Sequence, residues 1–201
     1  MSMPTAADFE VFRQSLTCEE REAIEKWQGS WDKIIRSYQI EGELPDPSIA
    51  SEEAVTDLVR NFTQAIGKAL VCRGPVFRGL SASRYCPKCI SYLRFLIAGP
   101  DELSFPSHDS ASVDEQIARG FCMTEVDDME KHLAVLLRID SLTSRFLKPF
   151  VHKHKDEGEV VLLKGAKYRK VKTRRSPDPK NGLEYWEVDL VEQPVRDVTT
   201  V

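Results

Sequence analysis

Apolar residues recur every three or four positions through the N-terminal third of the chain, the spacing that places them on one face of an α-helix. Thr17 and Glu20 form a capping box, which indicates a helix start. The apolar stripe that follows consists of Ile24, Trp27, Trp31, Ile34, Ile35 and Tyr38. We expect this helix to end in the Gly- and Pro-containing stretch 41–48, and a second helix to begin at Ser51. The stripe of the second helix consists of Val55, Leu58, Val59, Phe62, Ile66 and Ala69. At this spacing Trp27 and Trp31 are expected in the core rather than as a platform for stacking bases.

The pattern changes after Leu70 to short apolar runs separated by turn residues. The runs that predict strands lie at residues 75–80, 133–139, 160–163, 168–171 and 186–190. Helices are predicted from Pro87 to Gly99 and from Ser112, which forms a second capping box with Glu115. The sequence therefore predicts an α+β fold in a single domain over residues 1–201. A helical portion at 1–70 is expected to pack on a strand-rich core at 71–195, made of two sheets with mostly antiparallel or mixed strands.

Length and composition exclude several classes of protein. A chain of 201 residues, 41% apolar and 30% charged, can bury a core and is typical of a globular protein. Its apolar runs stop within about ten residues, far short of a membrane span. The first residues lack the basic start and apolar core of a secretory signal. Five cysteines, an odd number, favour reduced thiols in a cytosol-like compartment.

The distribution of charge differs from the total. The net charge of −4 by itself predicts neither a nucleic-acid partner nor a membrane partner. Residues 164–180, however, carry eight basic residues and one acidic residue, with Tyr168 among them. This segment is either a solvated hairpin or a basic ridge that docks an acidic protein or the phosphates of a nucleic acid. The rest of the chain is correspondingly acidic, so the net charge does not exclude a polyanionic partner.

Three segments place polar side chains in apolar, strand-like surroundings, where burial is costly unless a partner satisfies them. In the first segment Arg78 stands in the middle of the apolar run 75–80 and is followed by Gly79. A guanidinium offers planar paired donors to a phosphate, and the adjacent glycine lets a ligand approach the backbone. The alternatives are an arginine whose stem packs at a strand edge and an arginine paired with a structural carboxylate.

The other two segments carry hydroxyl and carboxylate groups. Ser110 and Ser112 point to the same side of an extended chain. Ser112 is explained as the N-cap of the helix that follows, whereas the Ser110 hydroxyl could orient a carboxylate or a sugar hydroxyl. Glu157 and Glu159 stand one residue apart at the start of an apolar strand. Such a pair is either an acid–base pair or solvated loop charge.

Together the three segments resemble the Arg-Ser-Glu class of mono-ADP-ribosyltransferases. This class includes clostridial binary-toxin and C3-like enzymes, vertebrate arginine-specific ecto-enzymes, and bacterial effector and phage enzymes. The resemblance covers about residues 70–191, in the family's order: aromatic-Arg-Gly at 77–79, Ser-Ala-Ser at 110–112 and Glu-Gly-Glu at 157–159. It implies a strand-rich NAD cleft beside a helical portion, with NAD as a substrate, no metal, and transfer of ADP-ribose to an arginine of a target protein.

The resemblance also implies roles for individual residues. Arg78 would bind the NAD phosphates, and Ser110 would hold the nicotinamide-ribose side of the substrate. Glu159 would stabilise the cationic sugar as nicotinamide leaves, and Glu157 would orient and help to deprotonate the acceptor. The further residues implied are Gly79, Ser112 and Phe121 for cofactor binding, and Phe150, His152 and His154, within the loop 149–156, for target binding.

Some features depart from the family or leave alternatives open. Ala111 stands where the family has threonine, so a hydrogen bond from that side chain is missing. The single Cys86-x-x-Cys89 pair is interpreted as incidental thiols at a helix start rather than a zinc site, because no spacing indicates two further ligands. Three alternative functions remain open. The chain could be an NAD glycohydrolase, in which water is the acceptor, or it could transfer ADP-ribose to a nucleic acid. It could also be a catalytically silent module that binds a partner through residues 164–180. We expect a monomer in the cytoplasm, or an effector delivered into a host cytosol without a secretory signal.

Overall fold

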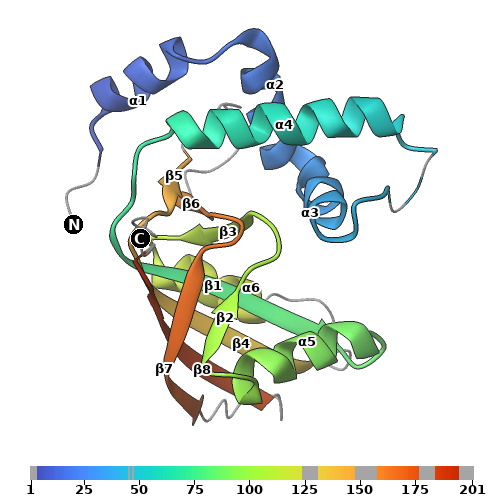
Figure 1. The fold of residues 1–201 in the computed structure, drawn as a ribbon. Helices are drawn as coiled ribbons and strands as arrows, with labels where there is room; N and C mark the ends of the chain where they lie inside the picture. Colours follow the sequence, from blue (N-terminus) through green and yellow to red (C-terminus); the bar gives the residue numbers. More distant parts are fainter. Residues whose placement is uncertain are drawn as a thin grey trace, which may run out of the picture. The chain divides into compact units, whose positions relative to one another are not determined.

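The computed structural model describes residues 4–44, 46, 48–123, 131–147, 158–176 and 184–194. The chain divides into two compact units, whose elements are labelled in Figure 1. Unit 1 comprises residues 1–72, 105–109 and 143–165. Unit 2 comprises residues 73–104, 110–142 and 166–201. Most of the described helical residues belong to unit 1, and most of the described strand residues belong to unit 2.

The helices of unit 1 are α1 (Ala6–Gln14), α2 (Cys18–Lys26), the π-helical turn η1 (Trp27–Trp31), α3 (Asp32–Glu41) and α4 (Glu52–Lys68). Two of them, α2 and α4, begin at the caps that the sequence predicts. The Thr17 hydroxyl accepts the Glu20 N–H at 3.2 Å, and the Ser51 hydroxyl accepts the Ala54 N–H at 3.2 Å. Gly42 ends α3 with φ of 75°, a left-handed conformation that glycine adopts without steric cost. The sequence predicts a single α-helix through Trp27 and Trp31. In the structure these residues bound the π-turn η1, which lies between α2 and α3.

The apolar stripes of these helices form one core within unit 1. Trp27 is 2% exposed, as predicted, and it stacks on Phe62 with ring centroids 4.3 Å apart. Unit 1 also contains the antiparallel strand pair β5 (Arg145–Phe146) and β6 (Glu159–Leu162). Leu147 and Val161 belong to the same core as the helices, so within this unit the helical portion packs on strand residues. The core residues are Phe12, Leu16, Ala23, Ile24, Trp27, Ile35, Leu58, Phe62, Ala65, Ile66, Ala69, Leu147 and Val161.

The strands of unit 2 form a mixed sheet in the order β2-β7-β8-β4-β1-β3. Their bounds are β1 (Gly74–Ser83), β2 (Glu102–Ser104), β3 (Asp109–Ser112), β4 (Lys131–Ser141), β7 (Lys167–Ser176) and β8 (Glu184–Glu192). The β4–β8 pair is parallel, and the β1–β4, β1–β3, β2–β7 and β7–β8 pairs are antiparallel. The α+β class and the mixture of strand directions are thus confirmed. The six strands of unit 2 are not divided between two sheets, because each is hydrogen-bonded to its neighbours in this order.

Two helices accompany the sheet of unit 2. Helix α5 (Pro87–Ala98) follows β1, and α6 (Glu115–Met123) follows β3. Ala118 and Cys122 of α6 share a small apolar core with Ala134 and Leu136 of β4 and Tyr185 of β8. No helix in the described part of the chain has both the length and the apolar character that crossing a membrane requires.

Candidate active site

Arg78 lies on β1, a strand with neighbours on both sides, so the interpretation as an edge arginine is wrong. Its side chain is 7% exposed, and Nη1 donates a hydrogen bond to the backbone oxygen of Ser110 on β3. The pairing of β1 with β3 also places Phe77 opposite Ser112. Unit 2 therefore brings together the arginine and the serine segment that the sequence singles out. This hydrogen bond to a carbonyl oxygen holds the arginine against the strand that carries Ser110.

Ser112 is 5% exposed, and the helix cap predicted at this position lies two residues too early. Its hydroxyl accepts the Asp114 N–H at 2.9 Å. The Asp114 carboxylate in turn accepts the Gln116 N–H at 2.7 Å, and its carbonyl accepts the Ala118 N–H at 3.2 Å. Asp114 therefore caps α6, because its carboxylate and its carbonyl accept N–H groups at the start of that helix. The capping box of Ser112 and Glu115 is wrong, and Ser112 stabilises the turn that precedes the cap.

Gly79 is explained by helix packing. A Cβ atom at this position would lie 1.8 Å from the Ala118 carbonyl oxygen and 3.0 Å from the Cys122 backbone nitrogen. Only a residue without a side chain lets α6 approach β1 this closely. The glycine therefore needs no ligand to account for it, and its part in NAD binding stays a prediction. Phe121, on the same helix, is 52% exposed, and its part in NAD binding likewise stays a prediction.

Glu159 lies in unit 1 at the start of β6, directly after Gly158, whose φ is 57°. Its two carboxylate oxygens accept hydrogen bonds from consecutive residues of η1. The Trp27 indole Nε1 donates to Oε1 at 3.1 Å, and the Gln28 Nε2 donates to Oε2 at 3.1 Å. The three residues that follow Glu159, at 160–162, are fully buried. The carboxylate thus sits at the end of a buried apolar strand, as the sequence predicts, and it is oriented by side chains that the sequence reasoning missed.

His108 is a second feature that the sequence did not indicate as important to the site. In unit 1 it is 5% exposed, its Nδ1 accepts the Lys164 N–H at 3.1 Å, and its Nε2 lies 3.5 Å from the Thr63 hydroxyl. Burial, together with the nearby Lys164 charge, lowers the pKa of His108 from 6.5 to about 4, although a hydrogen bond with the Leu162 backbone and the Asp109 charge act in the opposite direction. The imidazole is therefore neutral at pH 7. It anchors the segment that leads into β3.

Asp109, the first residue of β3, is also anchored within unit 1. Its Oδ1 accepts a hydrogen bond from Arg36 at 3.2 Å, and the preceding His108 N–H donates to the Gln39 side chain at 2.8 Å. Helix α3 therefore holds the start of the serine segment through two side chains. The residues Glu157, Phe150, His152 and His154, for which the sequence predicts acceptor and target roles, lie outside the described residues.

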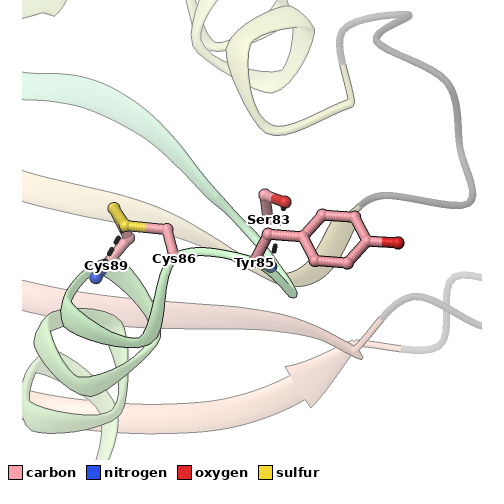
Figure 2. The surroundings of a disulfide bond; sticks show 4 residues. All are labelled: Ser83, Tyr85, Cys86 and Cys89. Atoms are coloured by element: carbon pink, nitrogen blue, oxygen red, sulfur yellow. Dashed lines mark hydrogen bonds between the residues drawn. A yellow bond between two sulfur atoms is a disulfide. The ribbon is translucent and has the colours of Figure 1, made fainter.

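Cys86 and Cys89 correct the expectation of reduced thiols. They are joined by a disulfide at the N-terminus of α5, next to Ser83 and Tyr85, as Figure 2 shows. The predicted helix start is present, with Pro87 in the first turn and the Cys86 sulfur accepting the Cys89 N–H at 3.3 Å. The remaining cysteines, Cys18, Cys72 and Cys122, are thiols. The helical start brings the two sulfur atoms of this pair within bonding distance.

Part of the basic segment is engaged in contacts within unit 2. Arg174 on β7 donates to the carboxylates of Glu187 and Asp189 on β8, at 2.6 Å and 3.0 Å. Lys170 donates to the backbone oxygens of Ile97 and Gly99 at 3.1 Å and 3.0 Å, where it neutralises the C-terminal end of α5. Other cations of β7 are exposed: Lys167, Arg169, Lys172 and Arg175. The hairpin is therefore partly a structural network and partly a basic surface.

Comparison with known proteins finds matches among solved structures. No protein-family profile and no curated protein matches the sequence. Among solved structures, the Vis toxin from Vibrio splendidus is 15% identical, with a TM-score of 0.65 over 100% of this chain and 91% of that chain. The C3 exoenzyme of Clostridium limosum is 15% identical, with a TM-score of 0.60 over 93% of this chain and 90% of that chain. The chain has the ADP-ribosyltransferase fold.

A third solved structure has the same fold in a longer protein. BECa, the ADP-ribosylating toxin of a binary enterotoxin from C. perfringens, was solved with NADH. It is 14% identical, with a TM-score of 0.66 over 93% of this chain and 46% of that chain. The resemblance to C3-like and binary-toxin enzymes that Arg78, Ser110 and Glu159 suggested is thus confirmed for the fold.

Proposed function

We propose that this chain is an NAD-dependent mono-ADP-ribosyltransferase that transfers ADP-ribose to an arginine side chain of a target protein. The observation that carries the proposal is the Glu159 carboxylate, fixed by two N–H donors at the start of a buried strand in a chain with the ADP-ribosyltransferase fold. The buried Arg78 beside Ser110 supports it from unit 2. NAD is a substrate in this proposal, and the solution of BECa with NADH supports that choice.

The reaction assigns one task to each residue. Arg78 binds the NAD phosphates through its guanidinium, and Ser110 holds the nicotinamide ribose. The bond between the ribose C1′ and the nicotinamide nitrogen breaks, and its electron pair leaves with nicotinamide, which becomes neutral. The ribose then carries the positive charge, which the Glu159 carboxylate stabilises while it accepts a hydrogen bond from a ribose hydroxyl. The acceptor nitrogen attacks C1′, and its proton passes to Glu157.

Arginine is the proposed acceptor because the sequence has glutamate at position 157. A carboxylate can pair with a guanidinium and take its proton, whereas an amide cannot accept a proton. A structure of the ADP-ribosyltransferase Vis was solved with agmatine, a small molecule that carries a guanidinium group. That complex supports a guanidinium acceptor here.

Replacing Glu159 tests the proposal most directly. Glu159→Gln keeps the shape of the side chain and an oxygen for the Trp27 donor, but it removes the negative charge. We expect nicotinamide release from NAD to fall by at least about a hundredfold, because the charge that stabilises the cationic sugar is lost. Release is measured by chromatography of reactions with purified protein, beside circular dichroism of both proteins.

Glu102 offers a matched control, since it is an exposed glutamate that also begins a strand. Glu102→Gln should release nicotinamide at the wild-type rate. Turnover by a folded Glu159→Gln protein at the wild-type rate would show that the carboxylate has no part in the reaction.

Glu157→Ala should separate the two halves of the reaction. We expect slow hydrolysis of NAD to continue, because the cationic sugar is still formed beside Glu159, while transfer to agmatine or to a protein arginine falls by at least about tenfold. Mass spectrometry of agmatine and nicotinamide in one reaction measures both. Equal loss of hydrolysis and transfer would contradict the division of labour between the two glutamates.

The class of acceptor is tested with labelled NAD and a cell lysate. Label that survives nuclease and is removed by protease supports a protein acceptor. Label that survives protease and is removed by nuclease supports transfer to a nucleic acid, and free ADP-ribose as the sole product supports a glycohydrolase. Without any turnover of NAD, binding of a partner through the basic segment is the function that remains.

A further inference from the structure

We propose that Trp27 and Gln28 are positioning residues that hold the Glu159 carboxylate in its reactive orientation, an inference that rests on the proposed function. Each carboxylate oxygen has its own donor: the Trp27 indole on Oε1 and the Gln28 amide on Oε2, both at 3.1 Å. A carboxylate held at one oxygen can rotate about its last bond. One held at both oxygens has a single plane.

The π-turn η1 explains how two consecutive residues reach one carboxylate. In an α-helix consecutive side chains point about 100° apart around the axis, since a turn takes about 3.6 residues. A π-turn takes more residues, so neighbouring side chains diverge less, and such turns are frequent at functional sites. Trp27 and Gln28 are the first two residues of η1. A continuous α-helix through these positions would aim the two donors further apart.

The packing of Trp27 makes this hold rigid. Its ring is 2% exposed and lies nearly parallel to the ring of Phe62, at 17° and with centroids 4.3 Å apart. Phe62 on α4 is fully buried, and its ring meets the His108 ring edge-on at 5.8 Å. The indole N–H therefore has a fixed direction before any substrate binds, which lowers the cost of ordering the site.

The arrangement also leaves the carboxylate able to act. An ionised carboxylate has about four acceptor positions, two on each oxygen. The N–H donors on the two oxygens fix the group. Both donors are neutral, so neither of them cancels the negative charge that would face the cationic sugar. Trp27 and Gln28 thus act through Glu159 and are not themselves catalytic residues.

Three variants test this role. Trp27→Phe keeps an aromatic ring on Phe62 and removes the N–H, and Gln28→Leu removes the amide at a half-buried position. Trp31→Phe is the matched control, because it is the same substitution within η1 and Trp31 packs on the same core. We expect the first two variants to lower kcat for nicotinamide release by about tenfold or more, with KM for NAD changed by less than about threefold. The control should keep the wild-type kcat.

A double-mutant cycle decides whether the effect passes through the carboxylate. In a Glu159→Gln background, Trp27→Phe should cause little further loss, because the group it positions is gone. Unchanged kcat in both single variants, a rise in KM alone, or full additivity in the cycle would each overturn the inference while the proposed function stands. A wild-type protein that releases no nicotinamide would overturn the proposed function, and the inference with it.

A different observation supports a second proposal. We infer that the Cys86–Cys89 disulfide is a site of thiol–disulfide exchange with small thiols. The pair lies at the N-terminus of the twelve-residue helix α5. Cys89 is exposed and Cys86 is half-buried, and Lys88 between them is exposed. Figure 2 shows the Tyr85 ring, which is 74% exposed, pointing away from the sulfur atoms. The aromatic side chain nearest in sequence therefore does not cover the bond.

The helix start selects which sulfur is attacked. A thiolate attacks the exposed Cys89 sulfur, the bond between the two sulfurs breaks, and Cys86 leaves as a thiolate. The leaving sulfur already accepts the Cys89 N–H at 3.3 Å, and the helix N-terminus favours its negative charge. A second thiol then attacks the mixed disulfide, releases the Cys89 thiolate and forms the oxidised form of the small thiol. Both cysteine thiolates take up protons from water.

Glutathione and dithiothreitol are the probes, with iodoacetamide labelling and peptide mapping of the folded protein as the readout. Before reduction we expect labelling at the exposed Cys18 but not at Cys86 or Cys89. After dithiothreitol both should label, while the buried Cys72 and Cys122 stay unlabelled and report that the protein is still folded. Glutathione should be trapped on Cys89. Labelling of the pair without reductant, resistance until the protein is unfolded, or glutathione trapped on Cys86 would overturn the proposal.

Discussion

At the scale of single residues, His108 shows how burial fixes a protonation state. Its ring is enclosed by Phe62 and Thr63 of α4 and by the Lys164 backbone, and its backbone N–H donates to Gln39. Because Nδ1 accepts a hydrogen bond, the proton of the neutral ring is on Nε2, toward Thr63. A protonated ring would turn the Nδ1 acceptor into a second donor that faces the Lys164 N–H. The neutral form is thus part of how the serine segment is anchored.

This burial predicts a loss of stability in mild acid. Burial lowers the pKa of His108 from 6.5 to about 4, so between these values the unfolded chain binds a proton that the folded protein does not. The free energy of unfolding therefore falls as the pH drops through this window, by a total on the order of 3 kcal/mol. Urea unfolding of the wild type and of His108→Asn at several pH values measures the effect. A wild-type pH dependence equal to that of the variant would show that His108 titrates normally.

At the scale of elements, the contact of β1 with α6 depends on Gly79. A Cβ there would lie 1.8 Å from the Ala118 carbonyl oxygen, which is backbone and cannot swing aside. We expect Gly79→Ala to destabilise the protein by about 1–3 kcal/mol or more, because α6 must move off the strand. Thermal unfolding followed by circular dichroism measures this.

Gly120 is the control within α6 itself. A Cβ at Gly120 meets nothing within 4 Å. Gly120→Ala should therefore stabilise the helix, by up to about 1 kcal/mol, because alanine has the higher helix propensity. Similar melting temperatures for the two variants would contradict the proposed packing role of Gly79.

The elements also show what the sequence can and cannot predict. The caps at Thr17 and Ser51 were predicted correctly, because an N-cap is a local contact between residues three apart. The cap at Ser112 was wrong because Asp114 competes for the same role two residues later. The π-turn was missed because Trp27, Trp31 and Ile35 stand four apart, a spacing that suits an unbroken α-helix. Periodicity locates a helix, but it does not reveal an extra residue within one turn.

In the candidate site, too, some residues were predicted from the sequence and others were not. Arg78, Ser110 and Glu159 were predicted from their type and order, because charged and hydroxyl groups in apolar strands are conspicuous in a sequence. Their partners were not predicted. The indole of Trp27 reaches Glu159 across more than a hundred residues of chain, and that contact depends on tertiary structure. A tryptophan at helical spacing gives no sign that its N–H has an acceptor.

At the scale of the whole molecule, charge is unevenly distributed along the chain. The net charge is −4, yet β7 exposes Lys167, Arg169, Lys172 and Arg175. Other cations of this strand are occupied, Arg174 by carboxylates and Lys170 by carbonyl oxygens. Lys167, Arg169 and Lys172 are therefore the candidates for a partner surface on β7, a smaller set than the sequence suggests.

The exposed cations of β7 are predicted to affect the transfer of ADP-ribose to a target but not the release of nicotinamide. We expect the double variant Lys167→Gln and Lys172→Gln to release nicotinamide at the wild-type rate. Its transfer of ADP-ribose to an acidic acceptor should fall several-fold at low salt and depend less on salt, because fewer ionic contacts are made. Initial rates of both reactions at several salt concentrations measure this. Identical transfer rates and salt dependence in variant and wild type would show that β7 does not dock the acceptor.

The π-turn has a consequence for insertions and deletions in this chain. A π-turn contains about one residue more than an α-turn, so deleting one residue from Trp27–Trp31 would leave an ordinary helix. Gly29 is the residue whose loss removes no side chain, and no neighbour lies within 4 Å of where its Cβ would be. Because the extra residue is taken up within the turn, the deletion would leave the helices on both sides close to their present register. Trp27 and Gln28 would then diverge by about 100°, as consecutive residues of an α-helix do, and the Glu159 carboxylate would lose one of its two donors. A loss that is sterically harmless at the position itself would be costly for the site, so the length of this segment is as constrained as its composition.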